Sequence, residues 1–535
     1  MPADPGPGPA AVEEVVLASR GLGGYRQYRI PALARTGTGA LLAVYDGRPT
    51  LDDLPSPCDL LMRRSDDGGR TWGAQQVLRT GTGLEGFGDA SLIADPGSGS
   101  GSGSGSGRIL CFHAATTRWG FFESEEGLDA TQHVDVSVSD DDGRTWSHRR
   151  LTSQLKSPGI RSIFAASGTG TRIDAGPHRG RLLQACVVLL STGRIAAAVA
   201  RSDDHGDTWA LGEPLRPSAA GAHTNESSVA ALADGTVLLQ SRCTPHRLAA
   251  VSHDGGASFS VPEPEAGLPD PSDNGSVLAL DGGGLAATHN AHSHLRRRTA
   301  ISHRATGGPW EEAVVLCPGA SGYSTAVALD GGRLGVFYER GAYEELVFAA
   351  VPLGVVTAPA APSEEPAARP VPGWPRLFAE VVPRSITSAP PARWSLVQEH
   401  AVLGRADGGY GPAGKEVGQV GAQVLASRAD LLANYGPPEP GVQPGDTVTY
   451  SAAVRNRGPA TVAVRPAGDL AGESRIVPPG GSAVWMHLNH VFPVPGPTSP
   501  APGADGWPVP APETLDIEWL VEPVPACRAP AQDAP

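Results

Sequence analysis

The chain has 535 residues, which is enough for two to four domains, and its 69 glycines and 51 prolines argue against long helices. Apolar residues make up 40% of the chain and charged residues 18%, a balance that supports a buried core and excludes global disorder. The net charge of −14 argues against nucleic acid or an anionic membrane as the main partner. No apolar run reaches the ~18 residues of a membrane-spanning helix, so we expect no membrane insertion.

The chain begins MPADPGPGPAAVEEVV, which has neither the basic region nor the apolar stretch of a signal peptide. We therefore expect a cytoplasmic protein, with secretion by a route not visible in the sequence as the alternative. We also expect residues 1–13 to form a disordered tail. The cysteines show no CxxC pair or regular spacing, so free thiols are expected rather than disulfides or a zinc site. They are Cys58, Cys111, Cys186, Cys243, Cys317 and Cys527.

One short motif recurs along the first half of the chain. SDDGGRTW starts at Ser65, SDDDGRTW at Ser139, SDDHGDTW at Ser202 and the degenerate copy SHDGGASF at Ser252. The shared pattern S-x-D-x-G-x-[TS]-[WF] predicts a tight hairpin turn, in which the aspartate accepts backbone N–H groups and the glycine takes positive φ. The aromatic residue is expected to pack under the next strand. Short alternating runs flank the copies, so we interpret them as folding devices between strands, far from any chemistry.

Composition also marks the domain boundaries. Residues 97–107 alternate glycine and serine and predict a flexible surface loop, while a proline-rich stretch predicts a linker over residues 358–375. Beyond the linker the motif stops, and residues 442–458 and 480–492 each contain a strand pattern of period two. We expect a small Ig-like β-sandwich over residues 376–525 and a disordered tail over 526–535.

The sequence Tyr28-Arg29-Ile30-Pro31 precedes the first motif and matches the [FY]RIP signature of sialidases. Together with the repeated aspartate boxes it resembles the sialidase (exo-α-neuraminidase) family of six-bladed β-propellers. The resemblance extends to about residue 355, and it implies an all-β fold with a propeller over residues 14–357. The segment GAYEELVFAAVPL, residues 341–353, resembles the closing strand of the animal cytosolic sialidases, whereas the C-terminal sandwich looks like an appendage of bacterial members.

The resemblance implies three arginines that bind the carboxylate of a sialoside. Arginines suit this role because bidentate, charge-assisted hydrogen bonds hold a carboxylate firmly. Arg29 and Arg242 match the first two positions. Arg296 fits the third best, although Arg297 or Arg298 could fill it. We expect the three to meet near the propeller axis, at the end opposite the aspartate boxes.

The family's nucleophile and its partner match Tyr323 in SGYSTAVAL and Glu226 in TNESSVAAL. A carboxylate nucleophile would be repelled by the substrate's own carboxylate, so a neutral tyrosine activated by a glutamate suits the reaction. Most glycosidases use two carboxylates, and sialidases with a tyrosine nucleophile are a known exception. The alternative interpretations are an ordinary core tyrosine and a solvated loop glutamate.

The resemblance implies that Asp53 is the acid/base that protonates the leaving oxygen and then activates water. A slip of one residue would give that role to Asp52 instead. Arg48 and Asp89 match further positions that contact substrate.

The implied activity is retaining exo-α-sialidase hydrolysis of terminal sialic acids on oligosaccharides, glycoproteins or glycolipids, by a monomer without a cofactor. His289, His292 and His294 are spaced like metal ligands, but no Asp, Glu or Cys partner converges on them in the sequence, so we expect no metal site. Two alternatives remain: a glycosidase of the same fold for a related nonulosonic acid, and a non-catalytic carbohydrate-binding propeller.

Overall fold

The computed structural model describes residues 12–357, apart from 26, 49–52, 83–84, 99–106, 294–295 and 342. Further along the chain it describes residues 380–388, 394–404, 419–421, 447–456, 461–468, 472–478, 482–491 and 514–523. The chain divides into two compact units, one of residues 1–368 with 433–436 and one of the remaining residues. The predicted linker, the C-terminal tail and residues 1–11 of the N-terminal tail lie outside the described residues.

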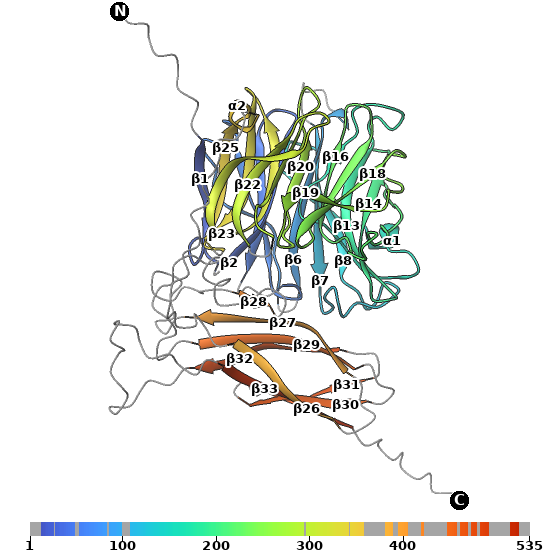
Figure 1. Cartoon of the computed structure of the whole chain (residues 1–535), viewed down its shortest axis with the longest axis vertical. Coiled ribbons are helices and arrows are strands. Elements are labelled where there is room, and N and C mark those ends of the chain that lie inside the picture. Colours follow the sequence, from blue (N-terminus) through green and yellow to red (C-terminus); the bar gives the residue numbers. More distant parts are fainter. Residues whose placement is uncertain are drawn as a thin grey trace, which may run out of the picture. The chain divides into compact units, whose positions relative to one another are not determined.

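The first unit is a six-bladed β-propeller, as predicted (Figure 1). Blade one consists of β2 (Gln27–Arg35), β3 (Leu41–Arg48), β4 (Asp59–Ser65) and β5 (Gln76–Arg79). Blade two consists of β6 (Gly86–Asp95), β7 (Arg108–Thr116), β8 (His133–Ser139) and β9 (Ser147–Arg150). Blade three consists of β10 (Ile160–Ala165), β13 (Leu182–Leu190), β14 (Ile195–Ser202) and β15 (Ala210–Leu211). Blade four consists of β16 (Ser227–Ala231), β17 (Val237–Ser241), β18 (His246–Ser252) and β19 (Glu263–Pro269).

Blades five and six share one long strand. Blade five contains β20 (Ser276–Ala279), β21 (Leu285–Asn290), β22 (Arg297–Arg304) and the first part of β23 (Trp310–Leu329). The second part of β23 begins blade six, followed by β24 (Arg333–Arg340) and β25 (Glu345–Pro352). The fourth strand of blade six is β1 (Glu13–Ser19), which pairs antiparallel with β25 and closes the ring (Figure 1). Glu13, which we predicted to lie in the tail, is therefore the first residue of a strand.

Short elements fill some connections of the ring. They are η1 (Pro96–Ser98), α1 (Thr152–Leu155), α2 (Leu353–Val356), and the two-residue strands β11 (Gly168–Thr169) and β12 (Thr171–Arg172). The predicted Gly/Ser loop overlaps the end of η1, and residues 99–106 of it lie outside the described residues. No helix in the described ranges is long and apolar enough to cross a membrane.

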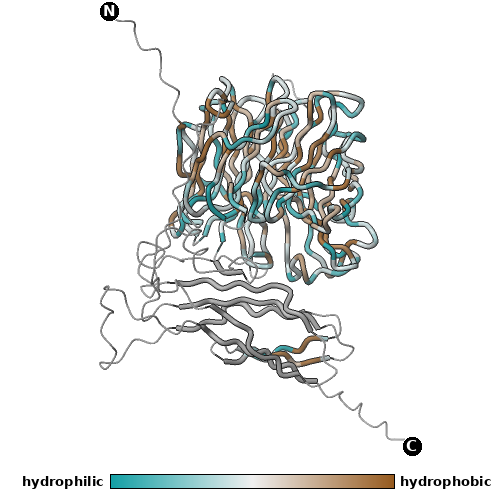
Figure 2. The backbone as a smooth tube through the Cα atoms, in the orientation of Figure 1, coloured by the Kyte–Doolittle hydropathy of each residue, from teal (hydrophilic) through white to brown (hydrophobic). Residues whose placement is uncertain are grey.

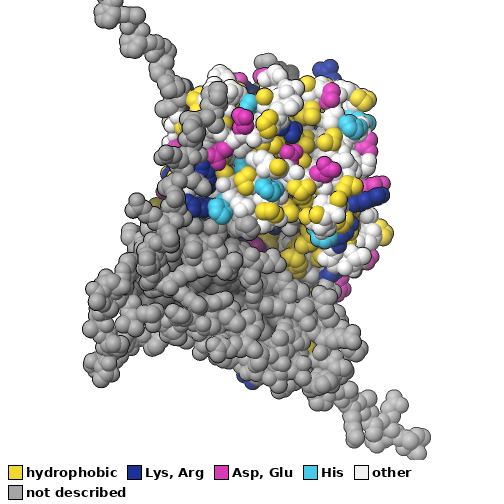
Figure 3. All heavy atoms as spheres, viewed as in Figure 1, with side chains coloured by type: hydrophobic (Ala, Val, Ile, Leu, Met, Phe, Trp, Pro, Cys, Tyr) yellow, Lys and Arg dark blue, Asp and Glu magenta, His cyan; other side chains and the backbone are white. Residues whose placement is uncertain are grey.

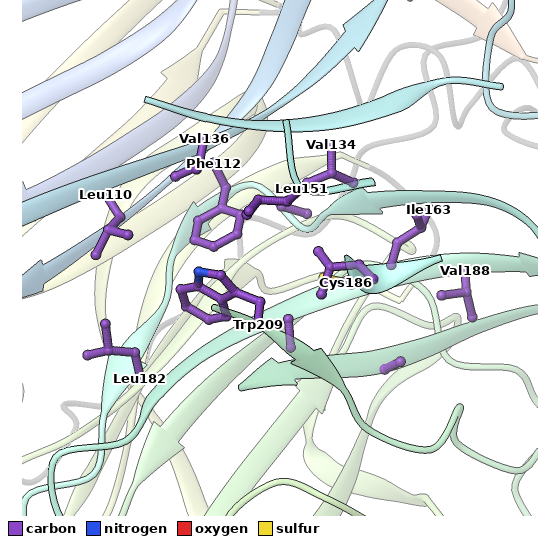
Figure 4. Packing of buried hydrophobic residues seen from close by; sticks show 14 of the residues in the cluster. Leu110, Phe112, Val134, Val136, Leu151, Ile163, Leu182, Cys186, Val188 and Trp209 are labelled. Carbon is purple, nitrogen blue, oxygen red and sulfur yellow. The ribbon is translucent and has the colours of Figure 1, made fainter. Parts of the chain in front are cut away.

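The core of the propeller lies between its blades. Each blade is buried on both faces, because a cluster of buried apolar side chains fills the space between every two neighbouring blades of the described ring. Hydrophobic segments accordingly follow the strands, while hydrophilic segments are frequent in the connections (Figure 2). Between blades two and three, Phe112 and Trp209 meet edge to face with their ring centroids 4.8 Å apart (Figure 4). Side chains of different classes are interspersed on the visible surface of the ring (Figure 3).

The four aspartate boxes form the predicted turns. Each lies between the third and fourth strands of a blade, in blades one to four. In the first box, Ser65 Oγ donates to Asp67 Oδ1 at 2.8 Å, and the same aspartate oxygen accepts the backbone N–H of Thr71 at 2.9 Å. The backbone N–H of Gly69, at φ 92°, donates to Ser65 Oγ at 2.9 Å. The corresponding serine-to-aspartate bond recurs in the boxes at Ser139, Ser202 and Ser252.

The aromatic residue of the box packs in the space between two blades. Trp72 lies edge to face with Phe348 of blade six, and Trp209 of the third box lies against Phe112 of blade two. The ring of each tryptophan therefore contacts the preceding blade. The physical reason is that the space between blades is where apolar surface can be buried.

The second unit contains two four-stranded sheets. One has the order β26 (Glu380–Ser388), β33 (Thr514–Pro523), β30 (Val462–Gly468) and β31 (Arg475–Val477). The other has the order β28 (Gln419–Gly421), β27 (Trp394–Gly404), β29 (Thr447–Asn456) and β32 (Ser482–Val491). β29 and β32 occupy the two segments where a strand was predicted. The Ig-like assignment stays a prediction.

Free thiols were expected, and the five cysteines within the described ranges carry them. Four of the five are buried, and Cys243 is partly exposed. Burial raises the pKa of Cys58 to about 12, so this thiol stays protonated at neutral pH. Cys527 lies outside the described residues.

Candidate active site

Three of the predicted site residues lie at irregularities in the inner strands of the blades. The register shifts next to Arg29 in β2, around Asp89 in β6 and around Tyr323 in β23. A bulge bends the strand and changes where its side chains point, which is why bulges are frequent at active sites. Ile30 and Asp89 accordingly have positive φ values of 63° and 58°.

The remaining site residues lie at the ends of strands on the same side of the ring. Glu226 immediately precedes β16, Arg242 follows β17 and Arg296 precedes β22. Arg48 is the last residue of β3, and Asp53 lies in the loop that follows it.

Strand register places this side of the ring opposite the aspartate boxes. In blade one, Asp46 near one end of β3 pairs with Arg29 of β2. Leu41, at the other end of β3, pairs with Ser65 of the box. In blade four, Ser241 precedes Arg242, while Val237 at the other end of β17 pairs with Ser252 of the box. The predicted separation between the boxes and the site is therefore confirmed for these blades.

Tyr323 lies at the centre of the site. Its hydroxyl donates a 2.6 Å hydrogen bond to Glu226 Oε2 and accepts one of 2.5 Å from Arg242 Nη1. Arg242 also forms an ion pair with Glu226. Tyr323 is 7% exposed and Glu226 is 3% exposed. The structure therefore brings together three site residues that come from two different blades.

The three predicted arginines surround the ring of Tyr323. The guanidinium carbons of Arg29, Arg242 and Arg296 lie 5.3, 6.0 and 5.4 Å from its centroid. The neighbours of Arg296 point elsewhere, because Arg297 donates to the carbonyl of Pro318 and Arg298 pairs with Glu312. Among the three adjacent arginines, Arg296 is thus the one beside Tyr323.

Arg48 and Asp53 form a second part of the site. Arg48 Nη1 donates to Asp53 Oδ1 at 2.8 Å, and the Asp53 side chain is 64% exposed. Arg48 is itself held by Asp46, which accepts from Arg48 Nη2 at 2.7 Å and Nε at 3.0 Å. The backbone N–H of Asp89 also donates to Asp46, at 3.2 Å. Asp52 lies outside the described residues.

The sequence did not reveal the buried acids that hold these groups in place. Glu339 accepts from Arg29 Nε at 2.7 Å and from the backbone N–H groups of Ile30 and Tyr323, each at 2.8 Å. Asp46 performs a similar task for Arg48 and Asp89. Each is the one acidic residue of a largely buried apolar strand, RLGVFYER for Glu339 and LLAVYDGR for Asp46, and a buried acid in such a strand is the signal that could have identified them.

Two further contacts to the arginines were also missed. Asp273 Oδ1 lies 3.4 Å from Arg296 Nε, and the hydroxyl of Tyr343 accepts a 2.9 Å hydrogen bond from Arg296 Nη1. The Tyr343 ring also lies under Arg29, with the guanidinium carbon 3.9 Å from its centroid. Both contacting residues lie in connections, Asp273 between β19 and β20 and Tyr343 between β24 and β25.

The electrostatics of the site favour binding of an anion beside a neutral tyrosine. Burial raises the pKa of the Tyr323 hydroxyl well above its ordinary value, while the guanidinium of Arg242 opposes that shift. Burial and the neighbouring carboxylate of Asp46 raise the pKa of Asp89. The site thus offers guanidinium N–H donors around a protonated tyrosine that already donates to Glu226. A carboxylate ligand fits this arrangement.

The histidines considered as metal ligands have other surroundings. His289 is buried, and its ring nitrogens contact the carbonyl oxygen of Pro269 at 2.9 Å and Ser302 Oγ at 2.8 Å. Burial lowers the pKa of His289 to about 4. His294 lies outside the described residues. In the part of the chain that the structure describes, no group of three His, Cys, Asp or Glu side chains could hold a metal ion.

The fold defines a six-bladed propeller with aspartate boxes, and its arginine-lined site has the chemistry to accept an anionic ligand. Residues 39–336 match the family described as BNR repeat-like domain, and the chain belongs to that family. It is 40% identical over 361 residues to the sialidase of Micromonospora viridifaciens, an alignment that covers 64% of this chain and 54% of that protein. It is 27% identical over 351 residues to the sialidase of Bacteroides fragilis, covering 61% of this chain and 62% of that protein.

Solved structures show the same likeness. The Hadza microbial sialidase Hz136 superposes with a TM-score of 0.55 at 26% identity, covering 62% of this chain and 66% of that one. The leech intramolecular trans-sialidase superposes with a TM-score of 0.54 at 17% identity, covering 62% of this chain and 69% of that one, and shows likeness of fold alone. The chain spans less than two thirds of the length of the two curated relatives named above.

Proposed function

We propose that this chain is a retaining exo-α-sialidase that hydrolyses terminal sialic acids from oligosaccharides, glycoproteins or glycolipids. The observation that carries the proposal is the arrangement around Tyr323. Its hydroxyl donates to Glu226, and three guanidinium groups lie within about 6 Å of its ring. The likeness to sialidases from two bacteria supports the same substrate class.

In this proposal the three arginines bind the carboxylate on the anomeric carbon of the substrate. Tyr323 then attacks that carbon while its proton passes to Glu226, which already accepts its hydrogen bond. An anionic nucleophile would be repelled by the substrate carboxylate, whereas a tyrosine kept protonated by burial approaches without that repulsion.

Asp53 is the proposed acid/base. It donates a proton to the leaving oxygen. After departure of the aglycone it takes a proton from the water that attacks the anomeric carbon, while the bond from that carbon to Tyr323 breaks and Glu226 returns its proton to the tyrosine oxygen. Its exposed position in a loop lets it approach a bound sugar, and its contact with Arg48 keeps it near the arginine cluster. The two displacements at the anomeric carbon give net retention.

The test is hydrolysis of a fluorogenic α-sialoside by the wild type and by Tyr323→Phe, which removes only the nucleophilic oxygen. Turnover should fall by several orders of magnitude, while the 2,3-unsaturated sialic acid analogue still binds, because an interaction of the transition state is lost. NMR of the first sugar released by the wild type should show the α-anomer.

The matched control is Tyr338→Phe, since the hydroxyl of this buried tyrosine bonds to Glu14 instead of to a site residue. Its turnover should equal that of the wild type. Release of the β-anomer, or near-normal turnover by Tyr323→Phe, contradicts the tyrosine mechanism. Binding of the analogue without any turnover by the wild type would instead indicate a carbohydrate-binding propeller.

A further inference from the structure

Tyr343 touches the site, yet the proposed reaction gives it no role. It lies in the turn between β24 and β25, next to the outermost pair of the two strands, Arg340 with Glu345. The side chain is only 5% exposed.

Its ring contacts two of the three arginines through two different surfaces. The guanidinium carbon of Arg29 lies 3.9 Å from the ring centroid, a distance typical of stacking on the ring face. The hydroxyl at the ring edge accepts a 2.9 Å hydrogen bond from Arg296 Nη1. One rigid side chain thus fixes the distance between two cations that would otherwise repel each other.

The two arginines differ in how much else holds them. Arg29 is also bound by Glu339 at 2.7 Å, so its position does not depend on Tyr343 alone. Besides its hydrogen bond to Tyr343, Arg296 has an ion pair with Asp273, at the longer distance of 3.4 Å. The Tyr343 hydroxyl is therefore the closer of these two contacts of Arg296.

The local backbone is shaped to put the ring in this place. Tyr343 has φ 67°, in the left-handed region that bulky residues rarely occupy. Gly322 makes room for the ring, because a Cβ at that position would lie 2.7 Å from Tyr343 Cε1. Strained residues that persist are often found where function requires them.

From this geometry we infer that Tyr343 is a positioning residue for the carboxylate clamp. It holds Arg296 at a set distance from Arg29, so that both can donate to one carboxylate. The inference rests on the proposed function, because it assumes that the arginines bind the carboxylate of a sialoside. It concerns the recognition of that anion and not the chemical step.

The decisive variant is Tyr343→Phe, which keeps the ring under Arg29 and removes the bond to Arg296. The KM for the fluorogenic sialoside should rise by roughly tenfold to a hundredfold, as for loss of a hydrogen bond to a charged group. The kcat should change little, because the clamp binds the carboxylate in the ground state as well as in the transition state. The unsaturated analogue should lose affinity by the same factor, whereas its methyl ester, which lacks the charge, should bind both proteins equally.

A double-variant comparison separates positioning from a general structural defect. In an Arg296→Ala background, Tyr343→Phe should cost no further affinity, while in an Arg242→Ala background its full effect should remain. Tyr338→Phe serves again as the control and should leave KM unchanged. If Tyr343→Phe does not fold by circular dichroism, Tyr343→His replaces it, because its shorter ring cannot place a polar atom at the hydroxyl position, and the same rise in KM is expected.

An unchanged KM in Tyr343→Phe, or an equal loss in the Arg296→Ala background, overturns the inference. Equal weakening of the analogue and of its methyl ester also overturns it. These results differ from failure of the proposed function, in which the wild type itself neither cleaves the sialoside nor binds the analogue.

Discussion

Glu339 offers the sharpest test of how the site is held together. Its carboxylate is fully buried, and the side chain of its partner Arg29 is 5% exposed. It accepts two N–H groups of Arg29, at 2.7 and 3.3 Å, and the backbone N–H groups of Ile30 and Tyr323. Glu339→Gln replaces one acceptor oxygen with a donor and leaves the charge of Arg29 without a counterion.

Removing one partner of a buried ion pair costs about 3–5 kcal/mol of unfolding free energy. For a propeller that extends from Glu13 to Val356, an unfolding entropy of about 2.1 cal/mol/K per residue converts this loss to a fall in Tm of about 4–7 °C. Thermal denaturation followed by circular dichroism measures the change. The same substitution at an exposed acid is the control: in the pair Arg35–Asp330 the side chains are 34% and 79% exposed, so Asp330→Asn should cost about 0–1 kcal/mol.

The reasoning would be refuted if Glu339→Gln melted within about 2 °C of the Asp330→Asn control. It would mean that the buried carboxylate does not organise the inner strands of blades one and six. A large loss in the control would show instead that carboxylates on the ring stabilise it wherever they lie.

Two further predictions concern the aspartate boxes and the core. Hydrogen bonds from the hydroxyl and backbone N–H of Thr71 lower the pKa of Asp67 from its ordinary value of 3.8 to about 2. Because the pKa of Asp67 is lower in the folded protein than in the unfolded chain, its stabilisation is complete above about pH 5 and is lost as pH falls toward 2. Between pH 5 and 3, the free energy of unfolding in urea should therefore fall less in Asp67→Ala than in the wild type. Equal decreases in the two proteins would disprove this prediction. Trp209→Ala removes a ring that is 5% exposed and should cost about 3–5 kcal/mol in the same assay, whereas a cost below about 1 kcal/mol would show that the space between blades two and three is not closely packed.

Local sequence patterns were sufficient to predict the repeating part of the fold. The box at Ser65 and its three counterparts satisfy their own backbone groups, so their turns form wherever the pattern occurs. The closing strand β1 was not predicted, because it is defined by pairing with β25, which lies at the far end of the propeller sequence. The length of β23 was not predicted because this strand pairs with β22 in blade five and continues to pair with β24 in blade six. Which distant strands pair with each other cannot be deduced from any single segment of the sequence.

The same division applies to the site. Arg29 and Tyr323 lie in recognisable motifs, and the structure places them beside each other. Glu339 lies 310 residues from Arg29, and the contact between them arises only when the sixth blade meets the first. Tyr343 was missed for a similar reason, since it contacts Arg29 and Arg296 only in the folded ring. Asp46 differs, because it lies two residues before Arg48 in β3 and its role was missed although the two are neighbours in the sequence.

The closure of the ring by β1 has a consequence for the order of synthesis. A ribosome produces β1 before any blade, yet its partner β25 follows all the other strands of the ring, with Glu13 pairing to Ala350. Until then the nascent chain carries an unpaired strand, whose exposed edge is a template for unwanted association. The two glutamates at the start of EEVVLAS disfavour such pairing because they place charge on the strand edge. In the complete ring, Glu14 accepts hydrogen bonds from Tyr338 and Arg340.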